Sequence, residues 1–251
     1  MAGNTSAPGS SVASRVLGVL AAFDERHRTL TLTELAARTG LPLSTTHRMV
    51  GELIGWGGLV RRDDGRYAIG HRLWDLGLLA PVQTGLRQVA SPFLHDVYAA
   101  TLPAVHLAVR DGHEVLYVER LAGRSSVPIV STVGSRLPLH CTGIGKILLA
   151  FAPEPVQRAV LAAPLRRVTR HTVTSPGRLA DQLARARSGG YASTVEEMSL
   201  GACSVAVPVR HDERVVAAVG IVVPTLRRDR PRLVAALQVT ARGIERSLGS
   251  S

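Results

Sequence analysis

The sequence predicts an α+β protein in two parts, and three observations support this. Between residues 12 and 56, apolar residues recur at helical spacing in three short segments. Two short apolar runs on either side of Asp64-Gly65 follow, which is the pattern of a β-hairpin. From residue 104 onward, apolar runs separated by turn residues occur among further helical segments. This second part therefore predicts a central antiparallel sheet flanked by helices.

Length and composition are those of an ordinary globular protein. The chain has 251 residues, of which 45% are hydrophobic and 20% charged, enough for one large or two modest domains. Residues 1–10 are small and polar, so we expect a disordered tail and no signal peptide. Without a run of 18 apolar residues, no membrane partner is expected. Two cysteines, Cys141 and Cys203, fit a reducing compartment, and we expect a cytoplasmic protein.

The net charge of +11 is not concentrated in the first part of the chain. Residues 1–80 contain nine arginines and seven acidic residues, so most of the excess lies after residue 80. An argument for nucleic-acid binding must therefore rest on where individual arginines lie and not on bulk charge.

Three helices are expected before residue 57. The first covers residues 12–23. The second follows Thr31 or Thr33 as a cap and ends at Gly40, where positive φ favours glycine. Pro42 suits the first turn of the third helix, because its fixed φ and missing N–H cost nothing there. Two helices joined by so short a turn form a helix-turn-helix.

The third helix has a core-facing side and a polar side. Residues at i, i+3, i+4 and i+7 face the core, namely Thr46, Met49, Val50 and Leu53. The other side carries hydroxyl, imidazole and guanidinium groups, from Ser44, Thr45, His47 and Arg48. These groups can hydrogen-bond base edges in a major groove and contact phosphates. The alternative is an ordinary amphipathic helical hairpin.

The hairpin that follows carries three arginines near its loop, Arg61, Arg62 and Arg66. A hairpin tipped with arginine directly after a recognition helix is placed to meet the sugar-phosphate backbone. Asp63 and Asp64 in the same loop leave a solvated charged turn as the alternative.

Together these features predict a winged helix-turn-helix domain over residues 11–70 that binds double-stranded DNA. The expected DNA contacts are Thr33, Ser44, Thr45, Thr46, His47, Arg48, Arg61, Arg62 and Arg66. Residues 71–85 are expected to form a linker helix. Its apolar residues surround much of its circumference, so it needs a partner, either another subunit or the protein's own domains.

The rest of the chain is expected to mix helices and strands. Helices are predicted at residues 83–100, 142–151, 155–162, 176–188 and 230–248. Strands are predicted at residues 104–109, 115–120, 126–132, 203–209 and 215–223, with a loop at 134–138 and an extended segment at 193–197. The helix after Thr142 starts with Gly143 and Gly145, which should leave its first N–H groups uncovered. Such a helix start can bind an anion or a carbonyl group.

Three stretches resemble the isocitrate-lyase-regulator (IclR) family of bacterial transcription factors in letters, order and separation. They read LTELAARTGLPLSTTHRMVGEL with a wing ending YAIGHRLWDLG, then LHCTGIGKILLA, then GYASTVEEMSLGACSVAVPV. The resemblance covers almost the whole chain. It implies a winged helix-turn-helix, a linker helix, and a GAF-like effector-binding domain over residues 86–251. It also implies dimers or pairs of dimers on palindromic operators. We expect no cofactor and no metal.

The resemblance places a small effector between the glycine-rich helix start and the last strands. The residues carried over are Gly143, Ile144, Thr194, Ala202, Ser204, Gly220 and Val222. In this arrangement the N–H groups of Gly143 and Ile144 would hold an effector carboxylate or carbonyl, with the Ser204 hydroxyl as a second partner.

This sequence departs from the family in ways that make the expected pocket less polar. A loop that is often acidic in the family reads Ser193-Thr194-Val195, and Gly220 and Val222 stand where some relatives carry hydroxyls. We therefore expect an effector larger and more apolar than a two- or three-carbon keto acid, such as an aromatic acid or a secondary metabolite.

An enzyme is the main alternative class. Cys141 lies at a helix start beside His140, so a thiol enzyme or redox sensor with Cys203 as resolving partner is conceivable. No triad-like order of residues supports catalysis. A metal site from His106, His113, His140 and Cys141 lacks paired spacing. The segment from Gly143 to Lys146 is too short for a phosphate loop.

Overall fold

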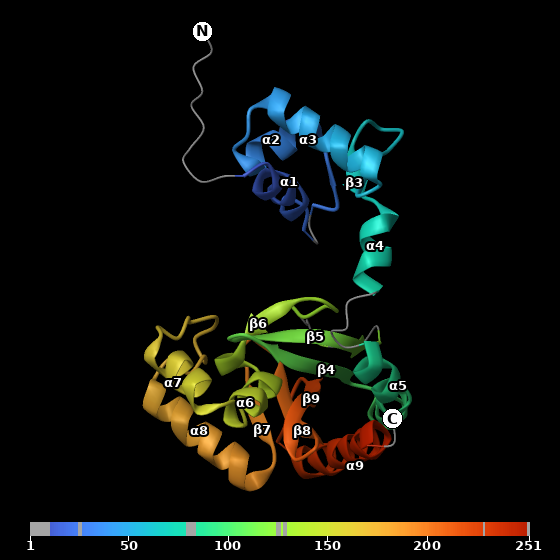
Figure 1. The fold of residues 1–251 in the computed structure, drawn as a ribbon. Helices are drawn as coiled ribbons and strands as arrows, with labels where there is room; N and C mark the ends of the chain where they lie inside the picture. Colours follow the sequence, from blue (N-terminus) through green and yellow to red (C-terminus); the bar gives the residue numbers. More distant parts are fainter. Residues whose placement is uncertain are drawn as a thin grey trace. The chain divides into compact units, whose positions relative to one another are not determined.

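The computed structural model describes residues 11–24, 27–78, 84–123, 127, 130–227 and 229–249 (Figure 1). The chain divides into two compact units, with the boundary between residues 82 and 83. The predicted tail at residues 1–10 lies outside the described residues. No helix in the described segments combines the length and apolar character needed to cross a membrane.

The first unit is the predicted winged helix-turn-helix. Its helices are α1 (Val12–Ala21), α2 (Leu32–Thr39), α3 (Leu43–Trp56) and α4 (His71–Leu78). Its strands β1 (Thr29–Leu30), β2 (Leu59–Arg61) and β3 (Tyr67–Ile69) form a small sheet in the order β1-β3-β2. Strand β1 was not predicted, since two residues are too few to show an alternating pattern.

The caps of this unit follow from its sequence. Thr31, and not Thr33, caps α2, in a capping box with Glu34. Gly40 has φ of 68°, as expected for the turn between α2 and α3. Pro42 lies one residue earlier than predicted, as the N-cap of α3. Behind these helices lies a core that includes Leu35.

The linker helix is described only in part. Helix α4 covers residues 71–78, and residues 79–83 of the expected 71–85 segment lie outside the described residues. Trp74 and Leu76 on α4 are exposed, at 66% and 46% of their surface.

The second unit is built on a six-stranded sheet in which every neighbouring pair is antiparallel, in the order β6-β5-β4-β9-β8-β7. Its strands are β4 (Ala104–Asp111), β5 (Glu114–Leu121), β6 (Arg136–Pro138), β7 (Ala192–Val195), β8 (Cys203–His211) and β9 (Arg214–Val223). Its helices are α5 (Thr84–Thr101), α6 (Gly143–Ala150), α7 (Glu154–Ala162), α8 (Pro176–Gly189) and α9 (Arg230–Gly249). The predicted α+β class with a central antiparallel sheet is confirmed.

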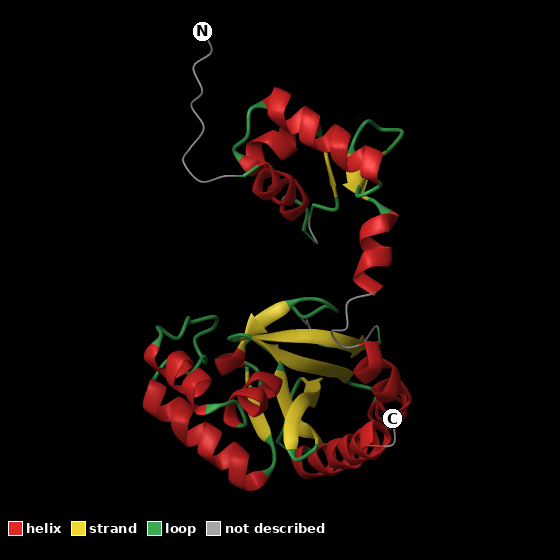
Figure 2. Cartoon of the chain, in the orientation of Figure 1, coloured by secondary structure: helices red, strands yellow, loops and turns green. Residues whose placement is uncertain are grey.

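Helices cover both faces of this sheet, as Figure 2 shows. Helices α5 and α9 lie on one face, over a core that includes Leu94, Val205 and Leu237. Helices α6 and α8 lie on the other face, over a core that includes Ile147 and Leu183. The site described below lies on this second face.

One predicted strand was misplaced. Residues 124–126 and 128–129 lie outside the described residues, and residues 127 and 130–132 are not in a strand. The strand is instead β6, within the expected loop at 134–138, and it pairs three residues long with β5. The sequence did not predict this strand because it contains Pro138, and proline is depleted in strands and tolerated mainly at a sheet edge.

Candidate functional site: an apolar cavity at the start of α6

The N-terminus of α6 is held by a side-chain cap. A 3₁₀ turn, Leu139–Cys141, leads into Thr142, whose Oγ1 accepts a hydrogen bond from the Gly145 N–H at 2.9 Å. A Cβ atom at Gly145 would lie 2.3 Å from the Leu139 carbonyl oxygen, so only glycine fits here. All eight residues of α6 are buried.

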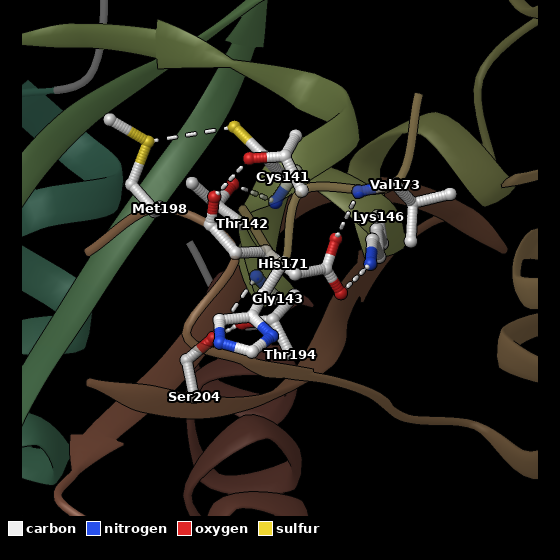
Figure 3. A network of polar contacts seen from close by, with 12 residues as sticks. Cys141, Thr142, Gly143, Lys146, His171, Val173, Thr194, Met198 and Ser204 are labelled. Atoms are coloured by element: carbon white, nitrogen blue, oxygen red, sulfur yellow. Dashed lines mark hydrogen bonds and ion pairs between the residues drawn. The ribbon is translucent and has the colours of Figure 1, made fainter. Parts of the chain in front are cut away.

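Three residues far apart in the sequence join at this helix start (Figure 3). The Gly143 N–H donates to Ser204 Oγ at 3.1 Å, and Thr194 Oγ1 lies 2.6 Å from the same oxygen. The expectation that α6 begins with uncovered N–H groups is therefore wrong for Gly143 and Gly145, since side-chain oxygens already accept both bonds. The Ile144 N–H is still available to a ligand, because the first turn of a helix provides no carbonyl acceptor for it.

A cavity of about 530 Å³, including its opening to solvent, lies between α6 and the sheet. All seven residues expected to bind an effector line it: Gly143, Ile144, Thr194, Ala202, Ser204, Gly220 and Val222. The other described lining residues are His106, Tyr117, Val130, Ser131, Leu137, Thr142, Met198, Ser199, Cys203, Val205 and Ile221. No carboxylate, lysine or arginine side chain is among them. The structure thus gathers the predicted residues around one mostly apolar cavity.

His106 on β4 is the one imidazole in this lining. It is 1% exposed, its Nε2 lies 3.1 Å from Ser131 Oγ, and its ring meets the Tyr117 ring edge-on with centroids 5.4 Å apart. Burial lowers the pKa of His106 to about 3, and the positive charge of Arg120 acts in the same direction. The imidazole is therefore neutral near pH 7 and can exchange hydrogen bonds with a bound molecule.

The depressed pKa of His106 predicts a pH-dependent stability. The unfolded chain binds a proton below pH about 6.5 that the folded chain accepts only near pH 3, so stability falls as pH drops through this window. The slope contributed is at most about 1.4 kcal/mol per pH unit. Urea unfolding followed by circular dichroism at pH 7, 6, 5 and 4 should show a shallower decline for His106→Gln than for the unmodified protein. Parallel declines would contradict a neutral buried imidazole.

A buried ion pair fixes the loop beside the cavity. Lys146 on α6 is 1% exposed, and its Nζ lies 2.5 Å from Glu197 Oε1 (Figure 3). Burial lowers the pKa of Lys146, while the negative charge of Glu197 opposes that shift. Glu197 directly precedes Met198 and Ser199 in the sequence. These two residues and Ala202 line the cavity. Because Glu197 already pairs with it, this lysine is not available to a phosphate.

The residues predicted to contact DNA differ in how exposed they are. Ser44, His47 and Arg48 are exposed on α3, Thr33 is exposed on α2, and Arg61 and Arg62 are exposed on the wing, while Thr45 is half-buried. Thr46 is a correction: it is fully buried and its Oγ1 donates to the Pro42 carbonyl, so it cannot reach DNA. Arg66 is half-buried, and its guanidinium is paired within its own unit, 2.8 Å from Glu34 Oε2 and 3.1 Å from the Thr29 carbonyl oxygen.

Comparison with known proteins decides the family. The family model of the IclR helix-turn-helix domain matches residues 12–64, and that of the bacterial transcriptional regulator IclR C-terminal domain matches residues 80–246. This chain belongs to the IclR family. An IclR chain of this kind is a DNA-binding transcriptional regulator that responds to a small-molecule effector, and it is not an enzyme.

Relatives match this IclR protein along nearly their whole length. The HTH-type transcriptional regulator XynR of Escherichia coli is 33% identical over 94% of this chain and 96% of its own. The glycerol operon regulatory protein of Streptomyces coelicolor is 35% identical, over 95% of each chain. A crystal structure of an IclR homolog from Microbacterium hydrocarbonoxydans, complexed with 4-hydroxybenzoate, has a TM-score of 0.92 and 37% identity, covering 96% of this chain and 100% of that one.

The thiol alternative finds no support in this IclR protein. Cys141 is buried, and its Sγ lies 3.5 Å from Met198 Sδ. Burial raises the pKa of Cys141 to about 12, with the negative charge of Glu197 acting in the same direction. A reactive thiolate requires the opposite shift. The metal alternative also finds no support, since no group of three suitable ligands occurs in the part of the chain that the structure describes.

Several lining residues were not predicted as effector contacts. His106 was considered only as a metal ligand, and Tyr117 and Ser131 were not considered. A histidine inside an otherwise apolar strand was the available signal, because a polar residue on a buried face needs a partner. Ser131 carried no comparable signal.

Proposed function

We propose that this IclR protein is a repressor that binds a palindromic operator as a homodimer and is controlled by an apolar or aromatic acid. The observation that carries this proposal is the cavity between α6 and the sheet. It is lined by all seven residues expected from the family and mainly by apolar groups. A DNA-binding regulator of this kind would act in the cytoplasm.

The lining of the cavity supports an effector with an apolar body. Small-molecule sites are lined mainly by apolar side chains with a few polar groups that fix the orientation of the ligand, and the lining of this cavity follows that pattern. A two- or three-carbon keto acid has little apolar surface to place against such a lining. The homolog complexed with 4-hydroxybenzoate also supports an aromatic acid, since that chain matches this one with a TM-score of 0.92.

Titration of the purified protein with small keto acids and with aromatic acids tests the effector class. We expect 4-hydroxybenzoate or a related aromatic acid to bind more tightly than glyoxylate or pyruvate, because ring burial adds to the free energy of binding. Isothermal titration calorimetry measures the affinity for each class of acid. Tight binding of the keto acids alone would refute the apolar effector.

We expect Arg48 on α3 to read the operator. Arg48→Ala should weaken operator binding by about 1 to 3 kcal/mol if the guanidinium contacts a base, with little loss on scrambled DNA. A mobility-shift assay measures the affinity of each variant for operator DNA and for scrambled DNA. Arg38→Ala is the matched control, because it removes the same charge from an arginine that pairs with Asp24 on its own unit. Equal losses on both DNAs would assign Arg48 to phosphate contact.

The exposed apolar side chains of α4 support the homodimer. Trp74 and Leu76 expose 66% and 46% of their surface, which is costly in water unless a partner covers them. A symmetric dimer would also hold two recognition helices about 34 Å apart, as successive major grooves require. Analytical ultracentrifugation of the protein and of Trp74→Glu tests this. A monomer at micromolar concentration, or an unchanged dimer in the variant, would contradict a role for α4.

A further inference from the structure

The cavity has polar groups at two ends of a mostly apolar lining. At one end, the start of α6, the Ile144 N–H is available, and the Thr194 and Ser204 hydroxyl oxygens lie 2.6 Å apart (Figure 3). At the other end lie His106 on β4 and Ser131, which are 1% and 3% exposed and also line the cavity. The family resemblance accounts for the first end and assigns nothing to the second.

The antiparallel register separates these two ends across the sheet. His106 stands opposite Gly220 on β9, and Gly220 stands opposite Ala206 on β8. Ser204 lies two residues before Ala206, so its side chain is on the same face of the sheet as His106. Two strand spacings and two residues along the strand place the α-carbons of His106 and Ser204 roughly 12 Å apart. A ligand that meets both ends must therefore carry two polar groups with a body between them.

The wall between the two ends is apolar. Ile144 packs over Gly220, where a Cβ atom would lie 2.9 Å from Ile144 Cγ1. Leu137 and Val205 line the same cavity. Because side chains of this kind form no hydrogen bonds, the body of the ligand that lies against them is expected to be apolar.

The two ends suit different chemical groups. N–H groups at the start of a helix carry a partial positive charge, which favours a carboxylate, and α6 is eight residues long. Burial lowers the pKa of His106 to about 3, so at pH 7 its imidazole offers hydrogen bonds without a charge. No charged side chain is among the described lining residues, so a second carboxylate at this end would lose its hydration with little compensation. The His106 end therefore suits a neutral hydrogen-bonding group.

His106 and Ser131 can accommodate such a group without breaking the bond between them. His106 Nε2 lies 3.1 Å from Ser131 Oγ, and a hydroxyl group can donate one hydrogen bond and accept two. The His106 ring is also oriented by its edge-on contact with the Tyr117 ring. A ligand with a methyl group at this position would exclude water from the remaining hydrogen-bonding positions and replace none of those bonds. This end can therefore discriminate between otherwise similar ligands.

We propose that His106 and Ser131 select the effector by a neutral hydrogen-bonding group, such as a hydroxyl group, at the end of the molecule remote from its acid. This assignment rests on the proposed aromatic-acid effector and narrows it to ring acids with a hydroxyl group opposite the carboxylate. The carboxylate then lies at the Ile144 N–H, and His106 becomes a specificity-determining residue.

Calorimetry on the full-length protein tests the assignment with ring acids that differ only opposite the carboxylate. The probes are 4-hydroxybenzoate, 4-methylbenzoate and the dicarboxylate terephthalate, with pyruvate as the keto acid. We expect the hydroxyl compound to bind at least fivefold more tightly than the methyl compound, and terephthalate to bind most weakly of the three. His106→Phe and Ser131→Ala should each reduce the preference for the hydroxyl compound to less than twofold. His106→Gln keeps a hydrogen-bonding group and should retain part of that preference.

His95→Phe is the matched control for the histidine substitution. His95 is exposed on α5, where its Nδ1 lies 2.8 Å from the Ser91 carbonyl oxygen, and it does not line the cavity. The control should leave the affinities for all three ring acids unchanged. Thermal unfolding checks that each variant folds.

The outcomes separate this assignment from the proposed effector class. Equal affinity for the hydroxyl and methyl compounds overturns the role of His106 and Ser131 while the aromatic effector stands. A preference for the hydroxyl compound that survives both His106→Phe and Ser131→Ala does the same. Tight binding of pyruvate alone overturns the aromatic effector, and this assignment with it.

Discussion

We expect Lys146→Met to lower the free energy of unfolding by about 3 to 5 kcal/mol, because it would leave the Glu197 carboxylate buried without its cation. Lys146 and Glu197 expose only 1% and 5% of their surface, and their charged atoms lie 2.5 Å apart. The variant should also loosen the segment after Glu197, and with it one wall of the cavity. Urea unfolding followed by circular dichroism measures the stability.

Two controls separate the loss of the pair from the loss of a lysine. The double variant Lys146→Met with Glu197→Gln removes both charges and should recover much of the lost stability. Arg158→Met breaks the exposed pair with Glu154 and should leave stability unchanged within error. A Lys146→Met protein as stable as the unmodified one would show that the pair is not buried as described.

We expect Gly145→Ala to lower the free energy of unfolding of the second unit by about 3 kcal/mol, which is the upper part of the range for overpacking a core. The added Cβ would lie 2.3 Å from the Leu139 carbonyl oxygen and 2.5 Å from Thr142 Oγ1, so the cap of α6 must move. Effector affinity should fall as well, since the displaced helix start lines the cavity. Thermal unfolding and calorimetry give the two readouts.

Gly177→Ala is the matched control for this change. It places the same methyl group on helix α8, where no atom lies within 4 Å of the added Cβ. Helix propensity then predicts equal or slightly greater stability. If both variants behaved alike, the close packing at the start of α6 would be refuted.

Features set by local sequence could be predicted. The α3 stripe, the turn at Gly40 and the hairpins around β4–β5 and β8–β9 depend on residues within a few positions of one another. Helical periodicity and turn chemistry report such contacts directly. The family resemblance then placed seven residues that do line one cavity.

Features set by distant contacts could not be predicted. The bond from the Gly143 N–H to Ser204 spans 61 residues, and the Lys146–Glu197 pair spans 51. Both pairings decide which groups at the start of α6 remain free, so the expected uncovered N–H groups were wrong. Thr46 shows that two signals at one residue can disagree. Its helical spacing predicted a core position, which the structure has, while its hydroxyl group suggested DNA contact.

The measurement that tests the central claim most directly is fluorescence anisotropy on the DNA upstream of the protein's own gene. It compares this DNA with a scrambled control at two salt concentrations, with and without 4-hydroxybenzoate. The account predicts selective binding that survives the higher salt, and an effector that changes operator affinity at least fivefold, as expected for coupling of about 1 kcal/mol or more. Equal binding to both DNAs that salt abolishes, or operator binding that no cavity ligand alters, would contradict it.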